Sequence, residues 1–282
     1  MTRPRHDHGD PVVAAHYAAP HLKAAILRGL KAIGRAADAI TPDDLAPVDE
    51  FHTLGREGTL EALSMMPLEP GMHVLDAGCG LGGPARRVAA DHGCRVTGID
   101  LTADYVETAR FLTAGMGLAE RCDFIEGSVL DMPFEDASFD AALSFHVGMN
   151  IADRERFYGE LARVLRPGAP LCIFDVMKGP AEGVPYPMPW SETAADSHLR
   201  TPAETRALLE AAGFEVTAER NLVERAERYY REAMARAAEA KAPPSLGLHM
   251  VTGANAPEKF ANVTRAYAAR QTEPVILVAR RR

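Results

Sequence analysis

The 282-residue sequence lacks long apolar runs and an excess of positive charge. No stretch approaches the roughly 20 apolar residues that a helix needs to cross a bilayer, and the opening "MTRPRHDHGD" contains no apolar segment of a secretory signal. Lysine and arginine total 31 against 39 aspartate and glutamate residues, a net charge of -8. Nucleic acids and anionic membrane surfaces favour basic proteins. We therefore predict a cytoplasmic protein without a membrane span or a nucleic-acid partner. The negative net charge is compatible with a cationic or zwitterionic small ligand.

Cysteine is scarce, with four residues and no C-x-x-C pair. Three of them, Cys94, Cys122 and Cys172, stand at or near the start of apolar runs with strand character. This distribution is typical of buried free thiols in a cytosolic protein and not of disulfides or a zinc site. The sequence therefore predicts neither a disulfide nor a bound metal.

Short apolar runs alternate with helical patterns from residue 72 onwards. Strand character is found in "MHVLDAG", "CRVTGID", "CDFIEG", "FDAALSFHV" and "APLCIFDVM", while helical patterns such as "ADYVETARFLTAGMG" and "DRERFYGELARVLRPG" separate them. This alternation indicates an α/β fold with a parallel sheet covered by helices on both faces. Right-handed crossovers place the carboxyl ends of the strands at one edge of the sheet, where ligands bind.

Two helical pieces lie outside this alternation. In the first, one apolar face of an N-terminal helix is marked by Leu22, Ile26, Leu30 and Ile33. The second lies between the last two strands and carries a helical stripe of apolar and aromatic residues. We predict that both cover the carboxyl edge of the sheet. The predicted division is an N-terminal helical cover (1–66), the Rossmann-like core (67–220), a helical insert that forms a lid over the substrate (221–271), and the last core strand with a short tail (272–282).

A glycine-rich pattern, G-x-G-x-x-G, lies within "VLDAGCGLGGPARRVAA" (74–90), between a predicted strand and a predicted helix. Such a turn lets the backbone approach a nucleotide, and the helix start supplies N–H donors. The pattern alone does not distinguish one nucleotide from another. No Lys-Ser/Thr pair follows the glycines, which excludes a P-loop.

Two acidic residues beside the glycines are more informative. Asp100 ends the second predicted strand, about 20 residues after the glycines, where an acid commonly holds ribose hydroxyls. Asp76 stands just before Gly78, and its carboxylate would repel a pyrophosphate in a crevice of low dielectric constant. S-adenosylmethionine, which has a ribose, an adenine, an ammonium and a sulfonium group, fits both acids. The acids favour this cofactor over a nicotinamide dinucleotide, which stays the alternative.

Four segments together resemble the class I S-adenosylmethionine-dependent methyltransferases: "VLDAGCGLGG" (74–83), "GIDLT" (98–102), "EGSVLDMPFEDASFD" (126–140) and "LARVLRPGAPL" (161–171). The resemblance implies a Rossmann-like, seven-stranded, mostly parallel sheet with an antiparallel last strand. It also implies S-adenosylhomocysteine as the product of the cofactor. Within the family, "DEFHTLGREGT" (49–59) is most similar to sarcosine/dimethylglycine N-methyltransferases and to quinone- or tocopherol-type methyltransferases.

The resemblance assigns roles to individual positions. It places His146, at the end of the fourth predicted strand, near the sulfur of the cofactor and the substrate. The cofactor-binding residues that it implies are Asp76, Gly78 and Gly80 along the methionine half, Asp100 at the ribose hydroxyls, Leu101, Ser128 and Val129 around the adenine, and Ser144.

His146 and His52 are the candidate general bases. For His146 a hydrogen-bonded strand-end histidine that only packs is an equal alternative, and for His52 the alternative is a surface histidine in a loop. The candidate substrate-binding residues are Tyr17, His52, Trp190 and Tyr229, because aromatic faces attract alkylated ammonium groups. Ordinary anchoring in the core or in a loop is the alternative for each aromatic residue.

These patterns predict an enzyme that methylates a small molecule. We place an amine nitrogen first as the acceptor, followed by the oxygen or carbon of a phenol-like, quinone-like or natural-product substrate. An amine has to arrive unprotonated, whereas a hydroxyl or an acidic carbon needs a base. The alternatives from other classes are an NAD(P)-dependent oxidoreductase and a cofactor-binding protein without catalysis. The sequence leaves a homodimer open.

Overall fold

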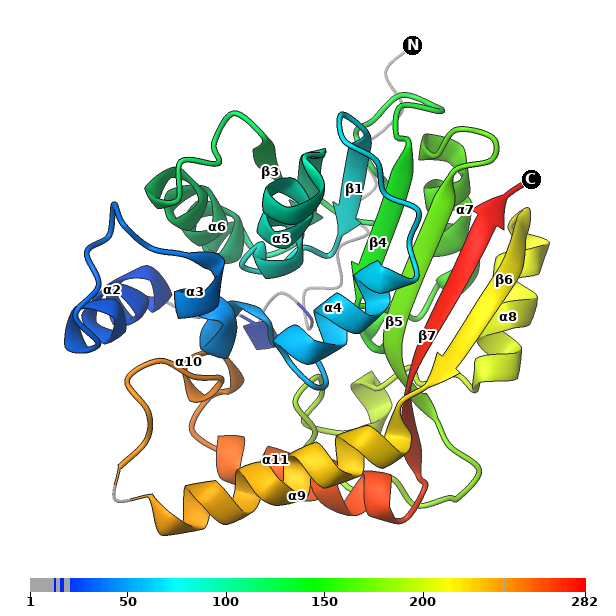
Figure 1. Ribbon diagram of the computed structural model, residues 1–282. Coiled ribbons are helices and arrows are strands. Elements are labelled where there is room, and N and C mark those ends of the chain that lie inside the picture. The colour runs from blue at the N-terminus through cyan, green and yellow to red at the C-terminus, as the bar shows by residue number, and fades with distance from the viewer. Residues whose placement is uncertain (1–12, 14–15, 18–20, 241) are drawn as a thin grey trace.

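A computed structural model describes residues 13, 16–17, 21–240 and 242–282 (Figure 1). Its centre is a seven-stranded sheet in the order β3-β2-β1-β4-β5-β7-β6. The strands β1 to β5 are parallel, and β7 is antiparallel to both β5 and β6. This confirms the Rossmann-like α/β fold with an antiparallel last strand. The strands are β1 (His73–Ala77), β2 (Arg95–Asp100), β3 (Cys122–Glu126), β4 (Ala141–Phe145), β5 (Pro170–Lys178), β6 (Phe214–Asn221) and β7 (Thr272–Arg281).

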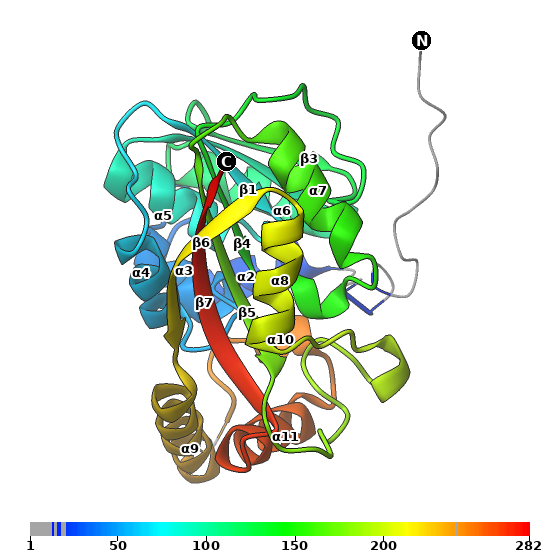
Figure 2. The same cartoon turned by 90° about the vertical axis from the view of Figure 1, so that its right-hand side faces the viewer.

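Helices cover both faces of this sheet (Figure 2). Successive residues of a strand point to opposite faces, so Val74 packs into one hydrophobic cluster and Leu75 into another. The cluster around Val74 contains residues of α4 (Arg56–Ser64), α5 (Gly83–His92) and α6 (Ala103–Gly115), and the cluster around Leu75 contains residues of α7 (Arg154–Val164) and α8 (Pro202–Ala211).

The start of α8 shows how local sequence determines an element. The hydroxyl of Thr201 accepts a hydrogen bond from the backbone N–H of Glu204 at 3.2 Å, and the Glu204 carboxylate accepts from the backbone N–H of Thr201 at 2.8 Å. Pro202 occupies the first helical position, where its missing N–H costs nothing. This capping box fixes the boundary between the loop before it and the helix.

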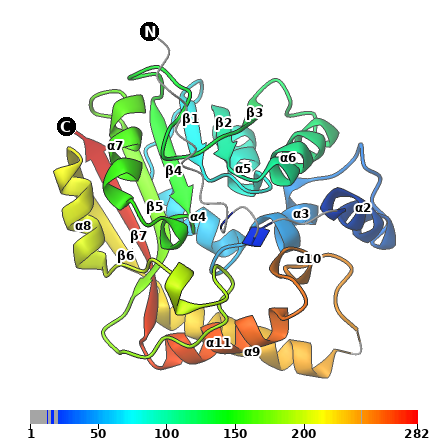
Figure 3. The ribbon, with the colours of Figure 1, turned by 180° about the vertical axis from the view of Figure 1, so that it is seen from behind.

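The remaining helices lie near the carboxyl ends of the parallel strands. In Figure 1, α9 and α11 cross below the ends of β4 and β5, and Figure 3 shows α10 close to α2 and α3. They lie within the predicted helical cover (1–66) and the predicted helical insert (221–271), and this division into domains stays a prediction. Their bounds are α2 (Leu22–Ala32), α3 (Pro42–Asp49), α9 (Val223–Glu239), α10 (His249–Thr252) and α11 (Ala256–Ala268).

Two further sequence predictions can be compared with the structure. The four cysteines are all buried free thiols, as the absence of C-x-x-C pairs indicated. Within the described ranges, every helix is too short or too polar to cross a membrane.

Candidate active site

A cavity of about 330 Å³ lies at the carboxyl ends of β1, β2 and β4. Its wall combines the ends of these strands with residues of the N-terminal cover and of the insert. It brings together most of the residues that the sequence singled out. These are Tyr17, His52, Asp76, Gly78, Gly80, Asp100, Leu101, Ser128, Val129, His146 and Trp190.

The glycine-rich loop between β1 and α5 forms one wall of the cavity. The backbone N–H groups of Gly78 and Cys79 donate to the carbonyl oxygen of Ile99 at 2.8 and 3.0 Å. Gly78 has a φ of 82°, and a Cβ atom there would lie 2.2 Å from Cγ2 of Val147. Gly80 has a φ of 51°, and a Cβ atom there would meet nothing within 4 Å. Gly78 therefore permits close packing, whereas Gly80 borders open space in the cavity.

Asp100 connects this loop to the end of β2. One carboxylate oxygen accepts from the backbone N–H of Gly80 at 2.8 Å, and the other accepts from the backbone N–H of Thr102 at 2.9 Å. Burial raises the pKa of Asp100, and these N–H groups oppose that rise. Because each carboxylate oxygen can accept more than one hydrogen bond, Asp100 is fixed in place and can still accept from a hydroxyl group.

Asp76 lies at the same end of the cavity with an oxygen, Oδ2, that is buried and has no hydrogen-bond partner. Burial, followed by the negative charge of Asp100, raises the pKa of Asp76 to about 8. No lysine or arginine among the described residues lines the cavity. Among all residues that the structure describes, no group of three His, Cys, Asp or Glu side chains could hold a metal ion. This acidic end is therefore suited to a ligand that brings its own positive charge.

His146 lines the cavity, but its hydrogen bonds argue against the predicted role as a general base. Its Nε2 accepts from the backbone N–H of Thr53 at 3.0 Å, and its Nδ1 lies 3.0 Å from the carbonyl oxygen of Phe174. A backbone N–H can only donate and a carbonyl can only accept, so Nδ1 carries the proton and the lone pair of Nε2 is engaged. Burial, and then His52, hold the pKa of His146 well below its usual value. These hydrogen bonds fix the loop carrying Thr53, and the lowered pKa favours the neutral form of the ring.

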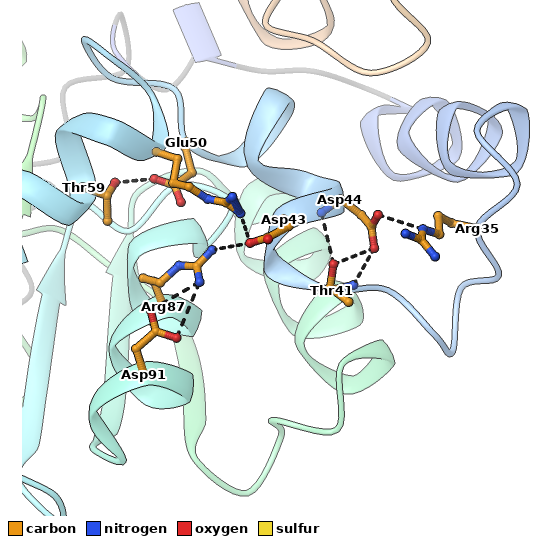
Figure 4. A network of polar contacts seen from close by, with 9 residues as sticks. Arg35, Thr41, Asp43, Asp44, Glu50, Thr59, Arg87 and Asp91 are labelled. Carbon is orange, nitrogen blue, oxygen red and sulfur yellow. Dashed lines mark hydrogen bonds and ion pairs between the residues drawn. The ribbon is translucent and has the colours of Figure 1, made fainter.

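His52 reaches the cavity from the loop that follows α3. Its Nε2 lies 2.6 Å from the hydroxyl oxygen of Thr59, which in turn contacts the Glu50 carboxylate (Figure 4). Burial lowers the pKa of His52 to about 4 and raises the pKa of Glu50 to about 7. His52 is therefore neutral at pH 7 and tied into a buried chain of hydrogen bonds. Its catalytic and substrate-binding roles stay predictions.

The aromatic wall differs from the expected one by a single helical position. Tyr229 is half-buried outside the cavity, and Tyr230, which is 8% exposed, lines it instead. Neighbouring residues of a helix point about 100° apart, so the two tyrosines face different directions. Tyr230 lies four residues after the fully buried Ala226, a spacing that could have identified it. We define the aromatic wall as Tyr17, Trp190, Tyr230, Phe260 and Tyr267; Phe51, Tyr105 and Phe145 also line the cavity.

Ser144, which the sequence assigns to cofactor binding, is not among the residues that line the cavity, and its role stays a prediction. It is part of β4, only 1% exposed, and its hydroxyl has no hydrogen-bond partner. The residues that reach the cavity after this strand begin with Phe145. Side chains alternate between the two faces along a strand, so a strand-end position alone does not say which residue faces a ligand.

Tyr17 and Asn150 form a polar pair in the otherwise aromatic part of the cavity. The hydroxyl oxygen of Tyr17 lies 3.3 Å from Nδ2 and 3.5 Å from Oδ1 of Asn150, which ends the short helix η1 (Gly148–Asn150). Burial raises the pKa of Tyr17, so its phenol stays protonated. Asn150 was not a sequence candidate, although its place after the fourth strand, on the ligand edge, could have indicated it.

Comparisons with known proteins relate part of this chain to a family. Residues 75–173 match the family model described as a methyltransferase domain. Over 104 residues, the chain is 42% identical to 24-methylenesterol C-methyltransferase 2 of Oryza sativa subsp. japonica. The aligned region covers 37% of this chain and 29% of that protein. Over 173 residues, it is 31% identical to an O-methyltransferase of Pyrenophora dematioidea. This aligned region covers 60% of this chain and 64% of that protein. The chain therefore spans less than two thirds of the length of either relative.

One solved structure covers 100% of both chains with a TM-score of 0.72 at 15% identity. It is the geranyl diphosphate C-methyltransferase of Streptomyces coelicolor A3(2), in complex with Mg²⁺, geranyl-S-thiolodiphosphate and S-adenosyl-L-homocysteine. At this level of identity the likeness shows the fold alone.

Proposed function

We propose that this chain, which carries a class I S-adenosylmethionine-dependent methyltransferase domain, methylates the nitrogen of a small, largely apolar amine. The composition of the cavity wall carries this choice of acceptor. Trp190, Tyr230, Phe260 and Tyr267 give it aromatic faces, and no lysine or arginine of the described residues lines it. Aromatic faces attract alkylated ammonium groups, whereas an anionic substrate would be buried without a cationic partner.

The residues at the acidic end of the cavity fit the cofactor. When bound, S-adenosylmethionine supplies a methyl group on a positively charged sulfur. The open space beside Gly80 would admit it, Asp100 would hold its ribose hydroxyls, and the unpartnered oxygen of Asp76 would face its positive charge. Ser128 and Val129 line the same cavity and would flank the adenine. These individual roles are part of the proposal.

The hydrogen bonds of the histidines favour nitrogen over oxygen as the acceptor atom. An unprotonated amine has a free lone pair and needs no base before it attacks, but a phenol has to lose its proton. His146 has no free lone pair, and His52 is held in a buried chain of hydrogen bonds. Tyr17 and Asn150 would orient the amine by accepting from its N–H or donating to other polar atoms of the substrate.

Transfer to carbon or oxygen is the second candidate, and the sequence relatives support it. One relative is a sterol C-methyltransferase by name and another is an O-methyltransferase. The first of these names gives a sterol, an apolar acceptor, which is compatible with the same wall. An oxidoreductase has no such support, because these relatives are methyltransferases and Asp76 opposes a pyrophosphate.

A labelled-methyl assay with matched acceptors tests this proposal. The protein is incubated with methyl-labelled S-adenosylmethionine and aryl-alkyl amines, their carboxylated counterparts, and the corresponding phenols. We expect the label in the amines and at least about tenfold slower transfer to the carboxylated set, because a buried unpaired carboxylate is costly. Transfer to phenols alone supports the second candidate, and preference for the carboxylated amines contradicts the account of the cavity wall.

Tyr17→Phe should lower kcat/KM for the amine about tenfold, because the hydroxyl that orients the acceptor is lost. Tyr229→Phe is the matched control, since this tyrosine lies outside the cavity. We expect it to stay within about twofold of the wild type. Steady-state kinetics at saturating cofactor measure both variants. Equal losses for the two variants would show that Tyr17 has no special role.

The affinity for S-adenosylhomocysteine should rise between about pH 6 and about pH 8. Asp76 has a pKa of about 8, so below that pH it holds a proton that a cationic ligand displaces. Binding then releases up to one proton, and the affinity rises by at most about tenfold per pH unit. Isothermal titration in two buffers of different ionisation enthalpy measures the proton released. Asp76→Asn should bind S-adenosylhomocysteine more weakly and without releasing this proton. If the variant releases as many protons on binding as the wild type, Asp76 is not their source.

A further inference from the structure

Asp49, the last residue of α3, places a buried carboxylate in the cavity wall next to the glycine-rich loop. Its side chain is 2% exposed. One oxygen, Oδ2, accepts from Nη2 of Arg86 at 2.6 Å, while the other, Oδ1, is buried without any hydrogen-bond partner. A buried carboxylate oxygen without a donor is costly, so this atom is suited to a donor from a ligand.

Arg86 holds Asp49 in this position and is itself held by other parts of the core. Its side chain is fully buried, and it also donates to the carbonyl oxygen of Leu81 at 2.7 Å and to the hydroxyl of Thr113 at 3.0 Å. The start of α5 lies so close to α3 that a Cβ atom at Gly83 would be 2.5 Å from the carbonyl oxygen of Asp49. The carboxylate is therefore fixed by the core and not by its own helix alone.

The charges around the cavity identify the kind of group that Asp49 can bind. Three carboxylates, from Asp49, Asp76 and Asp100, line one cavity, and two of them have a buried oxygen without a partner. Arg86 compensates for one charge, but it is not among the residues that line the cavity. A primary ammonium group has three N–H donors and a positive charge, and it can satisfy more than one such oxygen.

We propose that Oδ1 of Asp49 binds the α-ammonium group of the cofactor, so that the N-terminal cover supplies a cofactor-binding residue to the core. Arg86 is a positioning residue in this arrangement. The inference concerns the cofactor alone and does not depend on which acceptor is methylated.

A double-mutant-type cycle tests this contact: the affinities of two ligands for the wild type and for a variant are measured by isothermal titration, without any methyl acceptor. The ligands are S-adenosylhomocysteine and its analogue without the α-amino group. In the wild type, removing the amino group should weaken binding at least about tenfold, since a charge-assisted hydrogen bond is lost. In Asp49→Asn the same change should cost less than about threefold. Asp43→Asn is the matched control, because Asp43 lies in the same helix and contacts Arg87 at 2.8 Å, but its side chain is 64% exposed (Figure 4).

The outcomes separate a binding role from a structural one. Suppose that removing the amino group of the ligand lowers the affinity of Asp49→Asn by the same factor as that of the wild type. In that case the ammonium group is bound elsewhere and the proposal is overturned. If the wild type binds both ligands equally, the proposal also fails, whatever the variant does. Should Asp49→Asn not fold, Asp49→Glu keeps the charge near Arg86 but displaces the carboxylate. It should then show a smaller penalty for the missing amino group than the wild type, and an equal penalty contradicts the proposal.

Discussion

Asp100→Ala should weaken the binding of S-adenosylhomocysteine about 100-fold, the largest effect on cofactor binding that we expect. The carboxylate of Asp100 accepts from the backbone N–H groups of Gly80 and Thr102, at 2.8 and 2.9 Å. Its loss removes an acceptor for the ribose hydroxyls and also releases the glycine-rich loop from β2. Hydrogen bonds to charged groups contribute about 1.5–3 kcal/mol each, and the two effects act on one ligand.

Asp104→Ala is the control for this variant. Asp104 is an exposed residue in the first turn of α6, four positions further along the chain. It carries the same charge but lies outside the cavity wall, so its removal should change the affinity less than about threefold. Isothermal titration at constant pH and salt measures both affinities. Similar losses in the two variants would mean that only the overall charge near β2 matters.

Gly78→Ala should destabilise the folded protein by about 3 kcal/mol, because two costs coincide at this position. The φ of 82° is unfavourable for any residue with a side chain, and the new Cβ atom would lie 2.2 Å from Cγ2 of Val147. Gly80→Ala is the contrast, because its Cβ atom would have no neighbour within 4 Å. It should reduce the stability less and mainly obstruct the cofactor.

Shortening the neighbouring side chain separates these two costs. The double variant Gly78→Ala/Val147→Ala should be more stable than Gly78→Ala alone, because the close contact is removed while the backbone strain stays. Urea unfolding followed by circular dichroism gives the free energies of unfolding. If the smaller residue at 147 brings no recovery, overpacking against Val147 is not the cause of the instability.

The fold and the cofactor end of the cavity could be predicted because they depend on local patterns. Strand and helix periods indicated the parallel sheet, and its topology brings the ends of β1 and β2 to one edge. Asp76, Gly78 and Asp100 stand directly at those ends, so their positions in the chain almost determine their positions in space. The acidic side chain at position 76 then favoured a cationic ligand, because its place just before the glycines is set by the local sequence.

The acceptor end could not be predicted in the same way, because it depends on contacts between distant segments. The lone pair of His146 is engaged by Thr53, which is 93 residues away in the sequence. The choice between Tyr229 and Tyr230 depends on the rotation of α9 against the rest of the insert. Asn150 gains its role from Tyr17 in the N-terminal cover, 133 residues away. The pairings of His146 with Thr53 and of Asn150 with Tyr17 leave no periodic signal in the sequence.

A crystal structure with S-adenosylhomocysteine and an apolar amine tests the account most directly. We expect the ribose at Asp100, the ammonium group between Asp49 and Asp76, and the amine against Tyr17, Asn150 and the aromatic wall. Electron density for the ligand in the reverse orientation, with the adenine at the acidic end, or outside this cavity, would contradict it.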